Sequence, residues 1–471
     1  MPNLHNLATP IPLTQLPALA PAFERMQGNI LKSHGRNHAI NIFVHFNVPK
    51  AKVKKLLKSY GPKLTTLAKQ LAERQEFKKS GLEGDLFRGL LLTANGLTHL
   101  GASLASFPQD FKDGMKGANS RLNDPAVAKW DPGFQQDIHA LFVLADDDPH
   151  FLSREARSLL SELRPISDIV QIETGHGRRN SNGDHIEHFG YVDGRSQPVF
   201  FEDEVSSEQN SEGIDQWDPS AGPNLLLVKD PLDSHPESYG SFFVFRKLDQ
   251  DVRGFKKAEK ALGEAQDNAN IEIAGAQVVG RFENGAPITL AAAAAMTPGG
   301  GSTVPSPITD LPITGVPNNF NYDADAAGSR CPFHAHIRKS NPRGSSPGGL
   351  VFDRTKRLSR RGIPYGDRSE TEEPSPDLMP SKDVGLLFGC FVKSIADQFE
   401  FVQSSWVNNP NFPHGADGID PIIGQNTAST PQPWSKRYDQ SIPLDTPVDF
   451  KGFVSMRGGE YFYAPSIPFF N

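Results

Sequence analysis

The stretch GYVDGRSQP, residues 190–198, sets one acidic side chain, Asp193, between two glycines and just ahead of the apolar run PVFF at residues 198–201. Flanking glycines allow backbone conformations that are closed to other residues and a close approach to a ligand. An aspartate held at such a point beside an apolar pocket is a candidate for proton transfer. By itself the pattern describes an Asx-type turn between two elements equally well. Its interpretation therefore depends on the segments that accompany it.

Two later segments place basic side chains beside a candidate ligand. Residues 331–343 read CPFHAHIRKSNPR and put His336 ahead of Arg338, while residues 360–366 read RRGIPYG and begin with Arg360. Histidine is a common ligand of heme iron, and neighbouring cations suit a cofactor that carries two propionates. A guanidinium can stabilise the negative charge that develops when the O–O bond of a peroxide breaks. Taken singly, a loop histidine and an Arg-Arg pair are more typical of an exposed surface.

Other metal chemistries fit this sequence less well. His334 would share a face with His336 in a strand, but only one of the two would reach an iron from a loop or a helix. A zinc site of Cys331, His334 and His336 is a further alternative, although no second cysteine pair stands at ligand spacing. The CxxCH pattern of covalently attached c-type heme does not occur in the sequence. Zinc and c-type heme are therefore the weaker interpretations, and the residues alone leave open whether His336 is a ligand or a structural residue.

Taken together and in order, the three segments resemble the signature of the dye-decolourising peroxidases, a family of heme enzymes. Other segments are also similar to that family: QGNILK at residues 27–32, VGRF through GAP at residues 279–287, and IADQFEF at residues 395–401. The resemblance runs from residue 27 to the C-terminus and fits the larger, insertion-rich members of the family. One departure is Tyr191-Val192 inside the first motif, where phenylalanine and arginine are commoner in the family.

The resemblance implies a role for each matching residue. Asp193 would lie over the distal heme face and relay a proton, and Arg360, chosen over Arg361, would complete the distal pocket. His336 would ligate the iron of one heme b per chain. Peroxide bound opposite His336 would then lose its proton to Asp193 while Arg360 stabilises the departing oxygen.

Supporting residues around the cofactor follow from the same resemblance. Leu386 and Phe388 lie two apart on a predicted strand and therefore on one face, where they would line the distal pocket; plain core packing would account for them too. Asp420 would accept the other ring N–H of His336, a contact that raises ligand basicity, and an Asp-Pro turn is the equal alternative. Arg338 is the cation that we expect to bind the cofactor.

The activity that the resemblance implies is reduction of hydrogen peroxide, with one-electron oxidation of phenolic donors and bulky anthraquinone dyes. Such dyes are too large for a pocket lined by Leu386 and Phe388, so electrons would leave from the surface through an oxidisable side chain. Tyr365, five residues past Arg360, is the first candidate. Trp406 is the second, although packing in a core is the commoner role of an indole.

Two other classes of function compete with a peroxidase. A heme-handling protein, which binds heme without significant peroxidase turnover, would keep His336 but need neither Asp193 nor Arg360. A non-heme member of the same fold would serve as a binding or assembly module. The presence of both Asp193 and Arg360 favours the peroxidase.

Composition and charge narrow the possible partners. The 471 residues are 37% apolar and 22% charged, with a net charge of −7, which describes a globular enzyme and gives no support to binding of nucleic acid or an anionic membrane. No apolar run of about 18 residues predicts a spanning helix. Residues 1–30 show no secretory signal, and Cys331 and Cys390 are the only cysteines, so we expect a cytoplasmic protein. A secreted form with its signal removed is the alternative, and a homo-oligomer stays open.

Apolar periodicity predicts an α+β chain in which a strand-then-helix order occurs in both halves. Strands are predicted over residues 40–48, 87–92, 138–145, 166–173, 239–248 and 385–391, and helices over residues 50–74, 95–107, 149–163, 249–263 and 394–404. Loops are predicted over residues 209–224, 291–319, 340–349 and 366–380. The resemblance adds that two ferredoxin-like modules form a dimeric α/β-barrel-like heme fold. We expect an N-terminal extension over residues 1–26, which wraps the surface, a module with Asp193 over 27–225, and a heme-binding module over 226–471.

Overall fold

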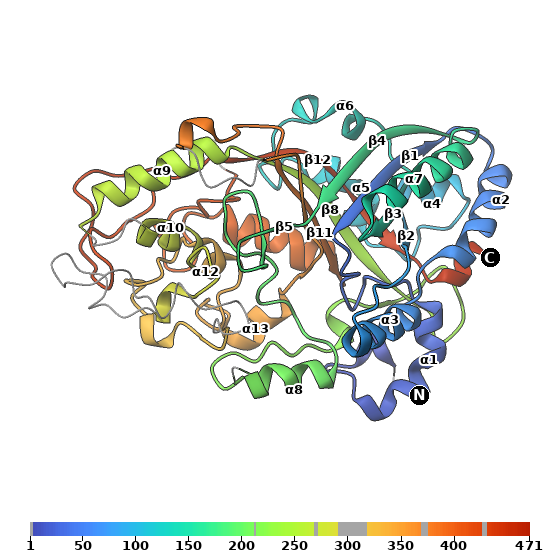
Figure 1. Ribbon diagram of the computed structural model, residues 1–471, viewed down its shortest axis with the longest axis horizontal. Coiled ribbons are helices and arrows are strands. Elements are labelled where there is room, and N and C mark those ends of the chain that lie inside the picture. The colour runs from blue at the N-terminus through green and yellow to red at the C-terminus, as the bar shows by residue number, and fades with distance from the viewer. Residues whose placement is uncertain (1–2, 212, 268–271, 291–317, 369–374, 426–430) are drawn as a thin grey trace.

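The computed structural model describes the whole chain except residues 1–2, 212, 268–271, 291–317, 369–374 and 426–430 (Figure 1). The predicted loop over residues 291–319 therefore lies outside the described residues except for its last two. Across the described part of the chain, no helix is both long enough and apolar enough to cross a membrane.

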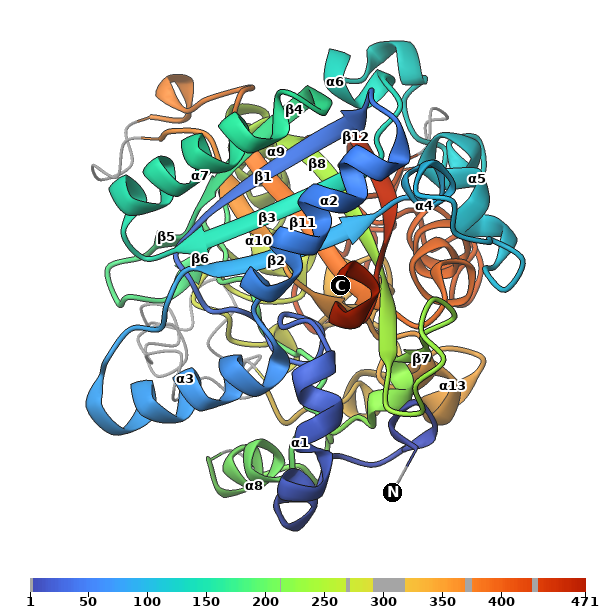
Figure 2. The same ribbon diagram turned by 90° about the vertical axis from the view of Figure 1, so that its right-hand side faces the viewer.

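An antiparallel sheet of ten strands forms the centre of the molecule (Figure 2). Along its main path the strands follow the order β10 (Ile363–Tyr365), β11 (Gly385–Val392), β8 (Tyr239–Gln250), β12 (Val454–Ala464), β2 (Phe87–Leu92), β3 (Ala140–Asp146), β1 (His38–Phe46) and β4 (Ser167–His176). Two short strands pair outside this path, β7 (Val228–Lys229) with β8 and β9 (Ser359–Arg360) with β11. A separate pair, β5 (Arg178–Arg179) and β6 (His185–Ile186), forms a hairpin beside the sheet.

Each half of the sheet has the strand order of a ferredoxin-like module. In the N-terminal half the order is β2-β3-β1-β4, and in the C-terminal half β10-β11-β8-β12. Numbered by their place in the sequence of each half, both sets read second, third, first, fourth, the order that the β-α-β-β-α-β arrangement produces. The expected α+β fold of two ferredoxin-like modules is confirmed.

The two halves join at one edge and meet again at the other. β12 pairs with β2 through Tyr463 and Leu92, which makes the sheet continuous. At the far edges, a Cβ added to Gly175 of β4 would lie only 2.4 Å from Cγ2 of Ile363 in β10. A glycine at this place lets the edge strands approach closely, so the sheet curls into a barrel.

Helices cover the outside of the barrel and form the lobe beside it (Figures 1 and 2). In the N-terminal half they are α1 (Leu16–Arg25), α2 (Lys50–Tyr60), α3 (Leu67–Ser80), α4 (Ala94–His99), α5 (Gln109–Ala118), α6 (Pro132–Gln135) and α7 (Pro149–Leu163). The segment that follows Asp193 adds α8 (Glu202–Ser211). In the C-terminal half the helices are α9 (Val252–Ala265), α10 (Glu272–Val279), α12 (His336–Ser340), α13 (Gly349–Thr355) and two π-helical turns, η11 (Ile395–Glu400) and η12 (Val402–Val407). Side-chain caps begin several of them, as when Asp148 accepts the amides of His150 and Phe151.

The six predicted strands are all confirmed, whereas four of the five predicted helices have different bounds. The helix expected over residues 394–404 is formed by the π-helical turns η11 and η12 and reaches Val407. The segment 50–74 forms two helices, because Pro62 lies in a 3₁₀ turn that separates α2 from α3. The helix expected over residues 95–107 ends at His99, and Gly101 follows with φ of +78°. The helix expected from residue 249 starts at Val252, since β8 continues to Gln250 and Asp251 provides the cap.

Strand β12 is the main element that sequence periodicity did not indicate. Gly458 and Gly459 interrupt its apolar pattern, and the pairing with β8 shifts register between Met456 and Gly458. Glycines inside a strand commonly mark such a bulge. β12 still forms a strand because its residues before and after the bulge pair with residues 241–250 of β8.

The N-terminal extension packs into the molecule instead of merely wrapping its surface. Leu4 and Ile11 are fully buried, and the Ile11 amide donates to the main-chain oxygen of Phe200 at 2.8 Å. Leu19 and Phe23 of α1 are 2% and 3% exposed. The prolines of this segment limit its conformations without keeping these side chains out of the core, while most of the residues between them are exposed or half-buried.

Candidate active site

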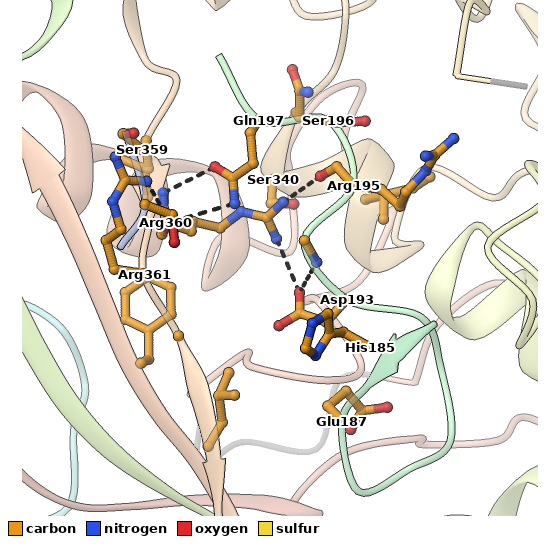
Figure 3. Close-up of a pocket in the computed structure, with 18 of the residues that line it drawn as sticks. His185, Glu187, Asp193, Arg195, Ser196, Gln197, Ser340, Ser359, Arg360 and Arg361 are labelled. Carbon is orange, nitrogen blue, oxygen red and sulfur yellow. Dashed lines mark hydrogen bonds and ion pairs between the residues drawn. The ribbon is translucent and has the colours of Figure 1, made fainter. Parts of the chain in front are cut away.

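A cavity of about 780 Å³ lies beside the C-terminal half of the barrel. Segments far apart in the sequence line it: the hairpin around Asp193, the start of α12, and the strands β8, β9 and β11 (Figure 3). Five residues that the sequence singled out line this cavity: Asp193, His336, Arg360, Leu386 and Phe388. The three sequence motifs thus meet at one site.

Asp193 is held by a second short hairpin, residues 185–193, which follows the β5–β6 pair and is called the hairpin from here on. Ile186 and Val192 bridge across the hairpin, and the Asp193 amide donates to the main-chain oxygen of His185 at 2.9 Å. Gly190 and Gly194 have φ of +101° and +82°, a region that other residues seldom adopt. The Gly194 amide donates to Oδ1 of the Asp193 carboxylate at 2.6 Å, which fixes the orientation of that carboxylate.

Arg360 faces Asp193 across the cavity wall (Figure 3). It ends β9, pairs with Cys390 of β11, and places its Nη1 3.7 Å from Oδ1 of Asp193. Its Nη2 donates to the main-chain oxygen of Arg195, and its amide donates to the Gln197 side chain. About a third of each side chain is exposed, 34% for Arg360 and 32% for Asp193, so both can meet a small molecule in the cavity.

Arg361 points away from Asp193 and holds the N-terminal segment. Its guanidinium donates to the main-chain oxygens of Asn29 and Ile30 at 2.6 and 2.7 Å. Burial lowers the pKa of Arg361 to about 9. Of the two adjacent arginines, the geometry therefore gives Arg360 the contact with Asp193.

His336 begins α12 and is oriented by a buried carboxylate. Its Nδ1 lies 2.8 Å from Oδ2 of Asp420, which is fully buried. The other oxygen of Asp420 accepts the amides of Ile422 and Ile423 at 2.8 and 2.9 Å. Because the carboxylate can only accept, the ring donates from Nδ1, and Nε2 carries the lone pair. A histidine held in this way is prepared for a metal ion.

Apolar side chains line the cavity from one face of the barrel. Leu386 and Phe388 lie two apart on β11, and their partners across the ladder are Leu248 and Arg246 of β8. All four line the cavity. The arrangement agrees with the expectation that Leu386 and Phe388 share a face.

Arg338 does not line the cavity, contrary to the role expected from the sequence. Its guanidinium is 2% exposed, pairs with Asp325 at 3.0 Å, and donates to the main-chain oxygen of Cys331. The neighbouring Lys339 turns to the main-chain oxygens of Phe412 and Gly418. A helical turn points successive side chains in different directions, so a basic run does not present all its charges to one ligand.

Other arginines supply positive charge to the cavity. Arg195, Arg281 and Arg343 line it. Arg281 and Arg343, each 5% exposed, share the side-chain oxygens of Ser196 and Asn318 as acceptors. Burial and the charge of Arg281 lower the pKa of Arg343. Two buried cations that share neutral acceptors favour an anionic group beside them.

Tyr365 and Trp406 are both buried, which does not fit the expected position at the surface. Tyr365 is 7% exposed and donates its hydroxyl to Asp249 at 2.7 Å. Trp406 is 3% exposed and stacks on Phe412 with ring centroids 5.3 Å apart. Neither lines the cavity.

The zinc alternative is not supported. Among the described residues, one group of three side chains could hold a metal ion, and it consists of His45, Asp137 and His139. His334 is fully buried against Trp434, with ring centroids 4.3 Å apart. Cys331 is also fully buried, and neither it nor His334 nor His336 belongs to that group.

Sequence reasoning missed several residues of the cavity. Glu187, Gln250 and Arg281 line it, and so does Arg195, which lies inside the motif that was quoted for Asp193. Position in a motif could have drawn attention to Arg195 and Arg281. Gln250 gave no such signal, because an isolated glutamine at a strand end has no spacing pattern to mark it.

Comparison with known proteins identifies relatives along the whole chain. Residues 25–179 match the family model described as the DyP dimeric alpha+beta barrel domain. The multifunctional dye peroxidase DyP2 of an Amycolatopsis species is 40% identical over 464 residues, covering 96% of this chain and 95% of that protein. The dye-decolorizing peroxidase msp1 of Mycetinis scorodonius is 31% identical over 80% of this chain and 74% of its own length.

Solved structures show the same architecture. The DyP-type peroxidase of an Anabaena species superposes with a TM-score of 0.88 at 37% identity, covering 99% of this chain and 98% of that one. The structure of the Amycolatopsis DyP2 gives a TM-score of 0.88 at 38% identity, covering 98% and 99% of the two chains.

Proposed function

Because the chain belongs to the dye-decolourising peroxidase family, we propose that it reduces hydrogen peroxide at a heme held in the cavity beside β8 and β11. The observation that carries this proposal is the pair formed by Asp193 and Arg360, with 3.7 Å between Oδ1 and Nη1. A proton acceptor and a fixed positive charge at one cavity are what heterolytic cleavage of a peroxide requires.

Heme is the cofactor that the family implies, and the residues of the cavity fit it. His336 offers Nε2 while Asp420 holds Nδ1, and the buried cations Arg281 and Arg343 suit two propionates. We propose heme b, one per chain, with His336 as the iron ligand and these arginines in the place that the sequence gave to Arg338. When bound, the heme supplies the iron at which peroxide is reduced and stores the oxidising equivalents for the donors.

The side chains of the protein move the proton and stabilise charge. The Asp193 carboxylate, oriented by the Gly194 amide, can take a proton from hydrogen peroxide and return it to the oxygen that departs. Arg360 stabilises the negative charge on that oxygen through the positive charge of its guanidinium. Leu386 and Phe388 limit the space and the water beside these two groups.

Aromatic molecules are the proposed electron donors. The relatives are named for dyes, and one related protein at 28% identity was solved in complex with 2,6-dimethoxyphenol. We propose that this protein oxidises phenolic donors and anthraquinone dyes in one-electron steps. Tyr365 stays a candidate for carrying electrons although it is buried, because its hydroxyl donates to Asp249, a carboxylate that can receive the phenolic proton.

We also propose where the protein is located and that it forms a homo-oligomer. Cys331 and Cys390 are both free and buried, which agrees with a cytoplasmic protein. A homo-oligomer is compatible with the fold and is tested by the mass of the protein in solution.

The visible spectrum of the purified protein tests the proposed cofactor and ligand. We expect a heme absorption band in the wild type and its loss in His336→Ala. His334→Ala is the matched control, because His334 lies two residues away and does not line the cavity, and it should keep the band. A wild type without heme, or loss of heme only in His334→Ala, would contradict the assignment.

A further inference from the structure

Glu187 lies in the cavity but has no part in the chemistry proposed above. Its carboxylate closes the hairpin that carries Asp193: Oε1 accepts the Tyr191 amide at 3.0 Å and Oε2 accepts the Phe189 amide at 2.8 Å. Its main chain closes the same turn, since Gly190 donates to its oxygen and its amide donates to Tyr191. One residue thus makes four of the hydrogen bonds that give the hairpin its shape.

The same carboxylate connects the hairpin to the barrel. Oε2 of Glu187 also accepts a hydrogen bond from Nε2 of Gln250, the last residue of β8. Gln250 is 5% exposed, and its amide donates to the main-chain oxygen of Val384 at 2.8 Å. The acceptor therefore belongs to the hairpin and the donor to a strand of the barrel. This hydrogen bond fixes the position of the hairpin relative to β8.

The relative position of hairpin and barrel matters because Asp193 and Arg360 come from different elements. Asp193 sits on the hairpin, whereas Arg360 is fixed by its pairing with β11. Arg360 touches the far arm of the hairpin through Arg195 and Gln197, and Glu187 holds the near arm. A displacement of about 1 Å between proton acceptor and charge is enough to slow a reaction about a hundredfold.

We propose that Glu187 is a positioning residue, which ties the hairpin to β8 through Gln250 and so sets where the Asp193 carboxylate lies relative to Arg360. The inference rests on the proposed function in one respect, that Asp193 is the proton-transfer group. The tie itself is a property of the chain and can be measured without peroxide.

The surroundings of the Glu187 carboxylate are compatible with a structural contact between the hairpin and β8. The pKa of Glu187 is raised to about 7, chiefly by burial and to a smaller extent by the charge of Asp193, although the hydrogen bonds from Phe189, Gln250 and Tyr191 act to lower it. On the adjacent helix α9, Glu259 accepts the Tyr191 hydroxyl and Lys256 bridges Glu259 to Glu283. Glu187 is therefore held by hydrogen bonds from both the hairpin and β8 in a mostly buried setting.

Amide hydrogen exchange measured on three variants tests the contact between Glu187 and Gln250. Glu187→Gln replaces one acceptor oxygen by a donor, so at least one of the three N–H groups loses its partner, and Gln250→Met removes only the contact with β8. We expect amides of residues 187–193 to exchange about tenfold faster in both variants, since the loss of a buried hydrogen bond makes local opening of the hairpin easier. Glu460→Gln is the matched control: that buried carboxylate also accepts two amides, those of Met115 and Tyr461, but it does not line the cavity.

Cyanide binding, followed by the visible spectrum across pH, tests the effect on Asp193. We expect the pH profile to differ from wild type in both Glu187→Gln and Gln250→Met, because a displaced Asp193 carboxylate is less able to take the proton from hydrogen cyanide. The double variant Glu187→Gln with Gln250→Glu reverses donor and acceptor and should recover part of the wild-type profile. Glu460→Gln should leave the profile unchanged.

The outcomes separate the two proposals. Unchanged exchange in residues 187–193 would overturn the tie, and faster exchange with a wild-type cyanide profile would show that Glu187 is structural only. If wild-type protein binds no cyanide, the proposed function fails. The positioning inference is then decided by crystal structures of wild type and Glu187→Gln: a shift of the Asp193 carboxylate relative to Arg360 upholds it, and an unmoved carboxylate refutes it.

Discussion

Replacing Arg338 by leucine tests whether this residue supports the fold or binds the cofactor. Its side chain and that of Asp325 are each 2% exposed, and the two pair at 3.0 Å. Arg338 also donates to the main-chain oxygens of Cys331 and Asp325 at 2.7 and 3.0 Å. Leucine would leave the Asp325 carboxylate buried without its cation. Loss of one partner of a buried pair costs about 3–5 kcal/mol, a large share of the roughly 5–15 kcal/mol by which a folded domain is stable.

Urea unfolding followed by circular dichroism measures this loss, with heme content determined on the same samples. We expect Arg338→Leu to unfold at a clearly lower urea concentration. Adding Asp325→Asn should regain about 0.5–3 kcal/mol, the usual range of coupling between contacting residues, because asparagine carries no charge and still accepts the Cys331 amide. A wild-type unfolding midpoint together with loss of heme would refute the reasoning and return Arg338 to the role that the sequence predicted.

Three further predictions concern catalysis and pH. Asp193→Asn and Arg360→Leu should each slow peroxide cleavage by about two to four orders of magnitude; near wild-type rates in stopped-flow mixing would rule out the proposed roles. Tyr365→Phe should reduce oxidation of large dyes and spare small phenols, whereas equal losses on both would make Tyr365 structural and unchanged dye turnover would remove it from the electron path. Burial, with His45 and His99 nearby, lowers the pKa of His139 to about 4. The folded protein therefore binds this proton more weakly than the unfolded chain, and stability is lost as pH falls from about 6.5 toward 4. His139→Gln should flatten that loss in thermal unfolding measured across pH, and an unaltered slope would contradict it.

Local patterns in the sequence were sufficient to find most of the barrel. The runs 40–48, 239–248 and 385–391 are rich in β-branched and aromatic residues, and each forms a strand where it was expected. Such strands are buried on the barrel face, so their side chains report the burial directly. β12 was missed because Gly458 and Gly459 break the same pattern at a bulge.

Direction of a side chain could not be obtained from spacing alone. Arg338 and Arg343 lie in one basic run, yet Arg338 turns to Asp325 and Arg343 to the cavity. Tyr365 follows Arg360 closely in sequence, but its hydroxyl lies against Asp249 of β8 and its ring is buried. Each outcome depends on partners from distant segments, which no local window contains.

The sequence by itself determined the family, the repeated α+β modules, and the three motifs with Asp193, His336 and Arg360, because these depend on residue type and local order. Only the tertiary structure decided how the motifs meet: that Arg360 faces Asp193 while Arg361 does not, that Asp420 holds His336 across 84 positions, and that Glu187 joins the hairpin to β8. The physical reason is that a hydrogen bond or ion pair acts over about 3–4 Å in space. Closure of the barrel sets those distances, and it depends on the packing of the whole chain.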